Sequence, residues 1–190
     1  MAKRSPTFIR VGTALLVLFV MVDLGVWLWW KSRKEHRYDR QIVLAGRKYN
    51  LDPALIKAVI WQESRFNPTA RGRAGEIGLM QVREDAALEW ADAEKIHPFV
   101  HEQIVDPSKN IEAGSYYLAH LMKRYQATDN PIPYALADYN AGRTHVLRWN
   151  KGPAKTNSTT FLAQMDYPGT RQYALNIMQR YEHYRKEIKN

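Results

Sequence analysis

One carboxylate in this sequence stands where a protein could use it as an acid. Glu63 ends the segment of residues 55–64, LIKAVIWQES. The apolar positions of that segment recur with the spacing of a core-facing helix: Leu55, Ile56, Val59 and Ile60. Because Glu63 follows them by one turn, it lies at the edge of the apolar stripe, where lost hydration raises the pKa of a carboxyl toward that of a general acid. The alternative is a structural role, in a capping network or an ion pair with Arg65.

Two further segments place polar groups beside predicted helix ends. Residues 78–81 (GLMQ) follow a glycine-containing loop, and residues 139–142 (YNAG) end a later helical segment. Each pattern is common by itself. The motifs HExxH, GxSxG, GxGxxG and Walker A are absent from the sequence. His97 and His101 have i, i+4 spacing, but Pro98 separates them, so we interpret them as surface residues and expect no metal and no cofactor.

The elements that must position these groups are predicted to be helical. Asp52-Pro53 and Asp106-Pro107 have the form of an N-cap followed by proline at the first helical position. The expected helices cover residues 39–49, 53–64, 78–92, 107–126, 131–141, 144–149, 161–165 and 170–189. Residues 69–77 and 151–160 are expected to be loops, and no convincing alternation of a strand occurs. The sequence therefore predicts an all-α domain.

The N-terminal region has a different composition. The run Val11–Trp30 is about one bilayer crossing long and holds one charge, Asp23. Tryptophans gather at its end and basic residues follow, as at a membrane interface. Bulky residues occupy the place of a signal-peptidase site, so we interpret the run as a transmembrane helix or uncleaved anchor. We expect residues 1–37 to form the anchor with its basic juxtamembrane segment, and residues 38–190 the soluble domain.

The charge of the chain does not indicate a nucleic-acid partner. Residues 1–37 hold seven Lys and Arg against Asp23 and Glu35, so they carry five of the nine net positive charges. The rest of the excess is spread thinly, with no basic patch interleaved with aromatic residues. A mildly cationic surface suits a polyanionic partner such as the bacterial envelope, and is equally an ordinary solvated surface. The absence of cysteine excludes disulfides and thiolate chemistry.

The three segments together resemble the family 1 lytic transglycosylases, whose SLT domain has a goose-type lysozyme-like fold. The matching residues are Glu63-Ser64 within IWQESRFNP, residues 78–81 (GLMQ) and residues 137–142 (ADYNAG). The resemblance extends from about Tyr38 to the end of the chain. It implies an all-α, lysozyme-like domain with a cleft for glycan strands of peptidoglycan. The implied reaction cleaves the MurNAc-β-1,4-GlcNAc bond and leaves 1,6-anhydromuramyl ends.

That reaction agrees with the single well-placed carboxylate. An ordinary glycosidase needs two carboxyl groups, whereas in a lytic reaction the C6 hydroxyl of the substrate is the nucleophile. Glu63 would then be the sole general acid and base. The resemblance implies that Ser64 and Gln81 hydrogen-bond substrate or hold Glu63, and that Met80 lines a sugar subsite. It also implies that Tyr139 approaches the reacting sugar, that Asn140 binds an N-acetyl or backbone group, and that Tyr173 forms part of the cleft wall. One departure is Gly169, which stands where the family often has Glu before the Thr-Arg-x-Tyr segment.

Two other functions remain open. If Glu76, in the glycine-containing loop, reached the cleft, a second carboxylate would permit hydrolysis by a muramidase; the alternative is a solvated loop residue. A non-catalytic scaffold that binds peptidoglycan within an envelope or secretion apparatus is the third possibility, although a pure binder has no need of Glu63.

The implied substrate also predicts the location of the protein. Lys and Arg flank both ends of the apolar run, and their balance mildly favours a cytoplasmic C-terminal domain. Peptidoglycan, however, lies outside the inner membrane. We therefore expect a single-pass inner-membrane protein, anchored through residues 11–30, with its catalytic domain in the periplasm.

Overall fold

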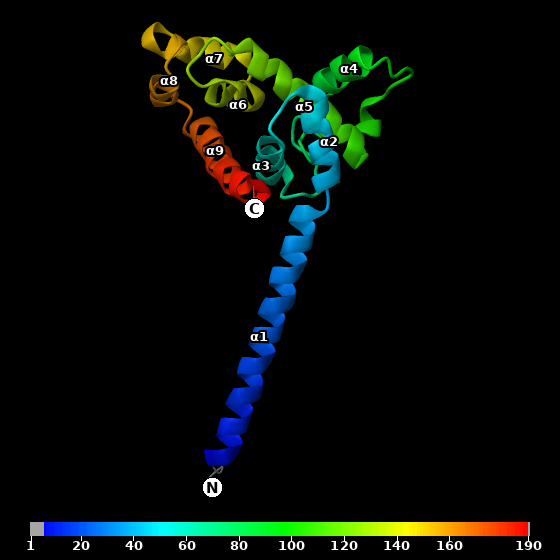
Figure 1. Cartoon of the computed structure of the whole chain (residues 1–190), viewed down its shortest axis with the longest axis vertical. Coiled ribbons are helices and arrows are strands. Elements are labelled where there is room, and N and C mark those ends of the chain that lie inside the picture. Colours follow the sequence, from blue (N-terminus) through cyan, green and yellow to red (C-terminus); the bar gives the residue numbers. More distant parts are fainter. Residues whose placement is uncertain (1–5, 190) are drawn as a thin grey trace. The chain divides into compact units, whose positions relative to one another are not determined.

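The computed structural model describes the backbone of residues 6–189 and the side chains of residues 16–30 and 32–187. The chain divides into two units, with the boundary between Arg37 and Tyr38. The first unit contains helix α1, and the second contains the remaining elements (Figure 1).

Helix α1 (Pro6–His36) makes up the described part of the first unit. Its large apolar side chains between residues 16 and 30 are exposed. Near its end, the guanidinium carbon of Arg33 lies 4.9 Å from the ring centre of Trp29. Within the described residues, no helix is both long and apolar enough to cross a membrane. The side chains of residues 11–15, where the predicted span begins, lie outside the described ones.

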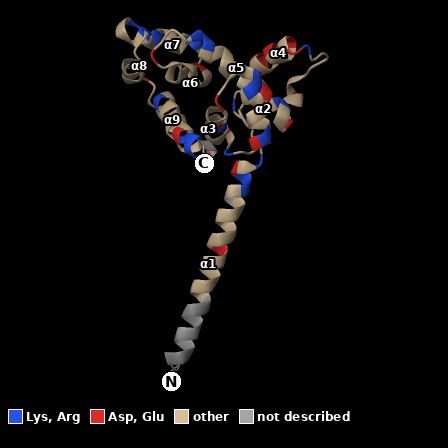
Figure 2. Ribbon diagram, viewed as in Figure 1, with Lys and Arg blue, Asp and Glu red and all other residues tan. Residues whose placement is uncertain are grey.

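The second unit is all-α, which confirms the predicted fold class. Its elements are α2 (Asp39–Tyr49), α3 (Pro53–Ser64), α4 (Glu84–Ala93), the 3₁₀ helix η1 (His101–Val105), α5 (Pro107–Arg124), α6 (Pro131–Ala141), α7 (Arg143–Trp149), the 3₁₀ helix η2 (Gly152–Lys155), α8 (Ser158–Gln164) and α9 (Pro168–Lys189). Extended pairing among the described residues consists of two isolated bridges in the loop before α4. Positions of Lys and Arg and positions of Asp and Glu alternate along the ribbon of these helices (Figure 2).

Helix α3 is the most deeply buried element. All residues from Ala54 to Ile60 are buried, including Lys57, so this part of the helix is enclosed on every side rather than along one stripe. Helices α2 and α9 pack against it. The ammonium of Lys57 is compensated by a carboxylate oxygen of Asp39 at 2.6 Å. This enclosure brings Glu63, at the end of the helix, into a partly buried position.

The predicted helix starts are confirmed by their caps. The side chain of Asp52 accepts a hydrogen bond of 2.9 Å from the amide two residues on, and Asp106 accepts bonds from the next two free amides at 3.0 and 2.9 Å. Asn130 caps α6 in the same way. Asn50 ends α2 in the left-handed conformation, with φ of 54°, as the sequence predicts.

The predicted helix over residues 78–92 is wrong in its first part. Helix α4 begins only at Glu84, and the preceding residues form a tight turn. Gln81 has φ of 48°, which breaks a helix, and Val82 exchanges two backbone hydrogen bonds with Ile77, of 3.0 and 3.1 Å. The amide and carbonyl groups of Ile77 and Val82 are thus paired with each other and not with the next turn of a helix.

Smaller differences lie in the C-terminal part. The predicted loop of residues 151–160 contains η2 and the start of α8, whose first turn is capped by the side chain of Asn157. Helix α7 starts at Arg143, directly after Gly142. The last helix begins at Pro168 rather than at residue 170, since proline fits the first helical position.

Candidate active site

Glu63 lies in the last turn of α3, half-buried, and lines a cleft. Burial is the largest influence on this group and raises the pKa of Glu63 to about 7. The negative charge of Glu76 acts in the same direction. The hydroxyl of Tyr173 opposes them, because it donates a hydrogen bond of 2.5 Å to Oε1 of Glu63 and so favours the carboxylate. Near neutral pH, Glu63 is therefore present in both protonation states.

The cleft beside Glu63 has a volume of about 710 Å³, within the range of small-molecule sites. Its walls come from the end of α3, the loop before α4, helices α4, α5 and α6, and the start of α7. The lining residues are Glu63, Gly72, Glu76, Gln81, Val82, Arg83, Asp85, Ala86, Glu89, Tyr117, Arg124, Asp138, Tyr139, Asn140, Ala141, Gly142 and Arg143.

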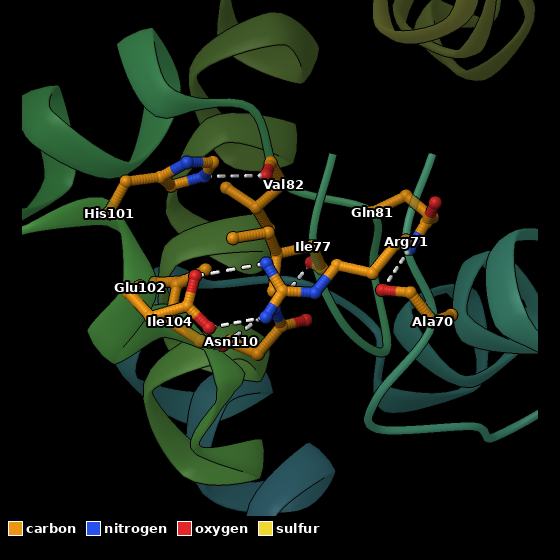
Figure 3. Close-up of polar contacts among 9 residues, drawn as sticks. All are labelled: Ala70, Arg71, Ile77, Gln81, Val82, His101, Glu102, Ile104 and Asn110. Atoms are coloured by element: carbon orange, nitrogen blue, oxygen red, sulfur yellow. Dashed lines mark hydrogen bonds and ion pairs between the residues drawn. The ribbon is translucent and has the colours of Figure 1, made fainter. Parts of the chain in front are cut away.

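Asn110 holds the turn of residues 77–80 from α5. Its side chain is buried, and its Oδ1 accepts a hydrogen bond of 2.8 Å from the amide of Met80. Its Nδ2 donates to the carbonyls of Ile77 and Ile104, at 2.8 and 3.0 Å (Figure 3). Gly78 has φ of 82°, and a Cβ there would overlap the amide of Asn110. The glycine of the GLMQ segment therefore makes room for a buried polar support.

A second set of contacts ties the same loop to η1. The guanidinium of Arg71 forms a two-pronged ion pair with the carboxylate of Glu102 (Figure 3). Nε2 of His101 lies 3.1 Å from the carbonyl oxygen of Val82, a contact that Figure 3 marks with a dashed line. The loop is thus held from two sides before it enters the cleft wall.

Ser64 and Met80 lie behind the cleft rather than in its lining. The hydroxyl of Ser64 donates to the carbonyl of Leu79 at 2.7 Å, which joins the end of α3 to the turn. The side chain of Met80 is fully buried, against Gly114 of α5, where a Cβ would overlap it. This corrects the expectation that Met80 lines a sugar subsite. Both residues instead position the parts of the chain that do.

Gln81, Tyr139 and Asn140 do line the cleft. Nε2 of Gln81 donates to the carbonyl of Gly78 at 2.9 Å and to that of Ala70 at 3.2 Å, so the side chain closes its own turn. The amide of Asn140 is exposed, and its Oδ1 accepts a hydrogen bond of 2.9 Å from the hydroxyl of Thr170.

Two tyrosine hydroxyls lie close to the acid. Tyr139 donates a hydrogen bond of 2.7 Å to the carbonyl of Met80. Tyr173 is buried outside the lining and reaches the site through its hydroxyl on Glu63. Burial, followed by the charge of Glu63, raises the pKa of both tyrosines well above the usual value. Both hydroxyls therefore stay protonated and act as donors.

Several lining residues were not predicted from the sequence. They come mainly from α4, α5 and the start of α7: Arg83, Asp85, Glu89, Tyr117, Arg124, Asp138 and Arg143. The ring of Tyr117 lies 5.5 Å from that of Tyr139 and extends the aromatic wall. Asp138 is buried and receives hydrogen bonds from Arg124 and from the hydroxyl of Tyr125, at 2.7 and 2.6 Å. Glu76, considered above as a solvated loop residue or a second acid, lies in the lining.

This arrangement is suited to proton transfer on a polar, ring-shaped ligand. One carboxyl with a pKa of about 7 can both donate and accept a proton at neutral pH. Tyrosine rings and amide groups beside it match the apolar faces and hydroxyls of sugars. Within the described residues, no group of three or more His, Cys, Asp and Glu side chains forms a candidate metal site.

Comparison with known proteins agrees with this chemistry. Residues 41–162 match the family described as Transglycosylase SLT domain. Membrane-bound lytic murein transglycosylase C from Shigella sonnei is 37% identical over 123 residues, which are 62% of this chain and 34% of that protein. The protein of the same name from Klebsiella pneumoniae strain 342 is 38% identical over the same shares. The matched part is thus about a third of the length of these relatives.

Solved structures share the fold. An inactive mutant of the lytic transglycosylase Slt from Pseudomonas aeruginosa superposes with a TM-score of 0.74 at 25% identity, over 81% of this chain and 25% of that one. The 70 kDa soluble lytic transglycosylase from Escherichia coli has a TM-score of 0.70 at 24% identity, over 80% of this chain and 24% of that one.

Proposed function

The chain belongs to the Transglycosylase SLT domain family, and on this premise we propose that it is a peptidoglycan lytic transglycosylase. Its substrate is the MurNAc-β-1,4-GlcNAc bond of glycan strands, and Glu63 is its general acid and base. The observation that carries this proposal is the position of Glu63, a carboxyl with a pKa of about 7 in the wall of a cleft of about 710 Å³.

Glu63 acts twice in the proposed reaction. In its protonated form it gives its proton to O4 of the leaving GlcNAc as the C1–O4 bond breaks. The carboxylate then takes the proton from the C6 hydroxyl of the muramyl residue, whose oxygen bonds to C1 and closes the 1,6-anhydro ring. No water is consumed, and Glu63 returns to its protonated form. A pKa of about 7 suits a group that must both donate and accept.

The neighbouring residues position the acid and the sugars. Tyr173 donates its hydrogen bond to Oε1 of Glu63, so Oε2 is the oxygen that protonates the glycosidic oxygen. Tyr139, Asn140 and Gln81 line the cleft. The ring of Tyr139 can pack on the apolar face of a sugar, and the amides of Asn140 and Gln81 can hydrogen-bond its polar groups. Ser64 and Met80 act indirectly, by joining α3 to the turn and by filling the core beneath it.

A hydrolytic muramidase is the second candidate, and the place of Glu76 in the cleft lining favours it. Hydrolysis would leave a reducing muramyl end, which is one water heavier than the anhydro product. The two reactions are therefore separated by the mass of the product.

The test is digestion of purified sacculi by the full-length protein in detergent, with the released muropeptides weighed by mass spectrometry. We expect anhydromuramyl products from the native chain and none from Glu63→Gln. Products with only reducing ends would show that the enzyme is a hydrolytic muramidase and not a lytic transglycosylase. Binding to sacculi with no release by the native protein would instead support the non-catalytic scaffold.

The proposal includes an anchor: residues 1–37 attach a catalytic domain of residues 38–190 to the inner membrane, with the domain in the periplasm. Its support is the apolar run of residues 11–30, the basic residues that follow it, and the name "membrane-bound" of two relatives. Alkaline phosphatase fused after Asn190 should be active, because it requires the periplasm. A reporter that is active only in the cytoplasm would contradict this topology.

A further inference from the structure

Glu76 brings a second carboxylate to the cleft of Glu63, from a loop instead of a helix. Both residues line the same cleft, and Glu76 is half-buried there. Its Oε2 accepts a hydrogen bond of 3.0 Å from the amide of Ala74. The ion pairs found in the described part of the chain do not include Glu76. Within the described residues, the charge of this cleft-lining carboxylate is therefore not neutralised by an ion pair.

The loop is built around this carboxylate. The amide of Gly72 donates to the carbonyl of Glu76 at 2.8 Å, and the bridge between Arg71 and Ile77 closes the base of the loop. A Cβ on Gly72 would overlap Oε2 of Glu76, so the absence of a side chain there leaves room for the carboxylate. The ion pair of Arg71 with Glu102 ties the loop to η1. Glu76 is thus held in place rather than free in solvent.

We propose that Glu76 is a positioning residue of this active site: a fixed negative charge that keeps Glu63 protonated and attracts the positive charge that develops on the muramyl ring. This inference rests on the proposed lytic function. Like charges in one site oppose each other's ionisation, and a fixed anion stabilises a cationic transition state in a partly enclosed cleft. Glu76 forms no bond and transfers no proton; C1–O4 still breaks and C1–O6 still forms through Glu63.

Besides burial, the groups that shift the pKa of Glu63 come from helix α9 and from the loop before α4. Tyr173 of α9 donates its hydrogen bond to Glu63 and lowers the pKa of that carboxyl, whereas Glu76 of the loop raises it. Tyr139 of α6 is a neutral donor whose hydroxyl is bound to the carbonyl of Met80. The same cleft is also lined by charged side chains of α4 to α7 and the residue before α4: Arg83, Asp85, Glu89, Arg124, Asp138 and Arg143. The charge that acts on the pKa of Glu63 is nevertheless that of Glu76, so removing it tests this one influence.

The test compares the pH dependence of turnover in full-length native protein, Glu76→Gln and Gly72→Ala. In Glu76→Gln the pKa of Glu63 falls, so the alkaline limb of kcat/KM, where the acid loses its proton, moves to lower pH. We also expect kcat at the optimum pH to fall about tenfold, because Glu76 supplies a modest part of the electrostatic stabilisation of the transition state. Gly72→Ala keeps the charge but displaces it, and should move the limb in the same direction.

The matched control is Asp92→Asn, which removes the same charge from a side chain that is 85% exposed and outside the cleft lining. Its pH profile should match that of the native protein. If the native protein is active and Glu76→Gln has the same alkaline limb and the same kcat, this inference is overturned. The proposed function is not affected by that result. If Glu76→Gln unfolds by circular dichroism, Glu76→Asp and Gly72→Ala decide in its place.

A carboxyl ¹³C NMR titration of Glu63 separates this inference from the proposed function. It compares the native protein with Glu76→Gln and does not depend on turnover. A lower titration midpoint in the variant supports the coupling even if sacculi are not digested. An unchanged midpoint contradicts it, whatever the reaction.

Discussion

The hydroxyl of Tyr173 in α9 donates a hydrogen bond of 2.5 Å to Oε1 of Glu63 in α3, 110 residues earlier in the chain. The two helices pack against each other, and Tyr173 is buried between the core and the acid. A buried ring has few rotamers to choose from, so its hydroxyl fixes the orientation of the carboxyl. This contact makes the C-terminal helix part of the active site.

Tyr173→Phe should move the alkaline limb of the pH–rate profile to higher pH. The lost hydrogen bond favours the carboxylate, so without it the pKa of Glu63 rises above about 7. This shift is opposite to that expected for Glu76→Gln. We also expect kcat to fall about tenfold, because the acid is less well oriented. Muropeptide release measured across pH checks both effects.

The control for Tyr173→Phe is Tyr181→Phe. Tyr181 lies on the same helix and also donates to a carboxylate, that of Asp52 at 2.8 Å, but this pair is exposed. The same chemical change there should leave the profile of turnover against pH as it is. Equal shifts in both variants would mean that the effect comes from α9 in general and not from the contact with Glu63.

Glu63→Gln should abolish turnover and spare binding. The amide retains the size of the carboxyl and a bond to Tyr173 but cannot protonate a glycosidic oxygen, so we expect a loss of about 10³-fold or more. Release of anhydromuropeptides measures turnover, and co-sedimentation with sacculi measures binding. Turnover within a few-fold of the native protein would exclude Glu63 as the acid.

The same substitution should stabilise the protein in alkaline solution. The pKa of Glu63 is about 7 in the folded chain and about 4.3 in an unfolded one, so the folded state holds the proton more tightly. The stability that this supplies is complete below about pH 4 and is lost as the pH rises through about 7. At pH 8, Glu63→Gln should therefore exceed the native protein by up to about 3 kcal/mol in free energy of unfolding. Thermal unfolding at pH 5 and pH 8 tests this, and an equal difference at both would contradict it.

Asn110→Ala should be strongly destabilising. It removes three hydrogen bonds and leaves the amide of Met80 and the carbonyls of Ile77 and Ile104 buried without this partner. We expect a loss of about 3–5 kcal/mol in the free energy of unfolding, measured by urea titration. The control is Asn157→Ala, which removes the exposed cap of α8 and should cost about 1 kcal/mol. Equal losses would mean that the turn does not depend on Asn110.

Short-range patterns in the sequence were sufficient for most helices and for the acid. Asp52, Asp106 and Asn50 mark helix boundaries because caps depend on a few neighbouring residues. The apolar run before Glu63 predicts a buried helix because hydrophobic spacing is a local property. The order of three short segments along the chain was enough to indicate the family that residues 41–162 match.

Tertiary structure decided which residues meet at the acid. Residues 78–81 form a turn, not a helix, because the side chain of Asn110, some thirty residues later, binds the backbone of that turn. Met80 is buried, Glu76 and Tyr117 enter the cleft, and Tyr173 reaches Glu63 only because α9 packs on α3. Sequence spacing specifies which face of one element a residue occupies. It does not specify which distant element will cover that face, and that choice determines the burial and the neighbouring charges that raise the pKa of Glu63.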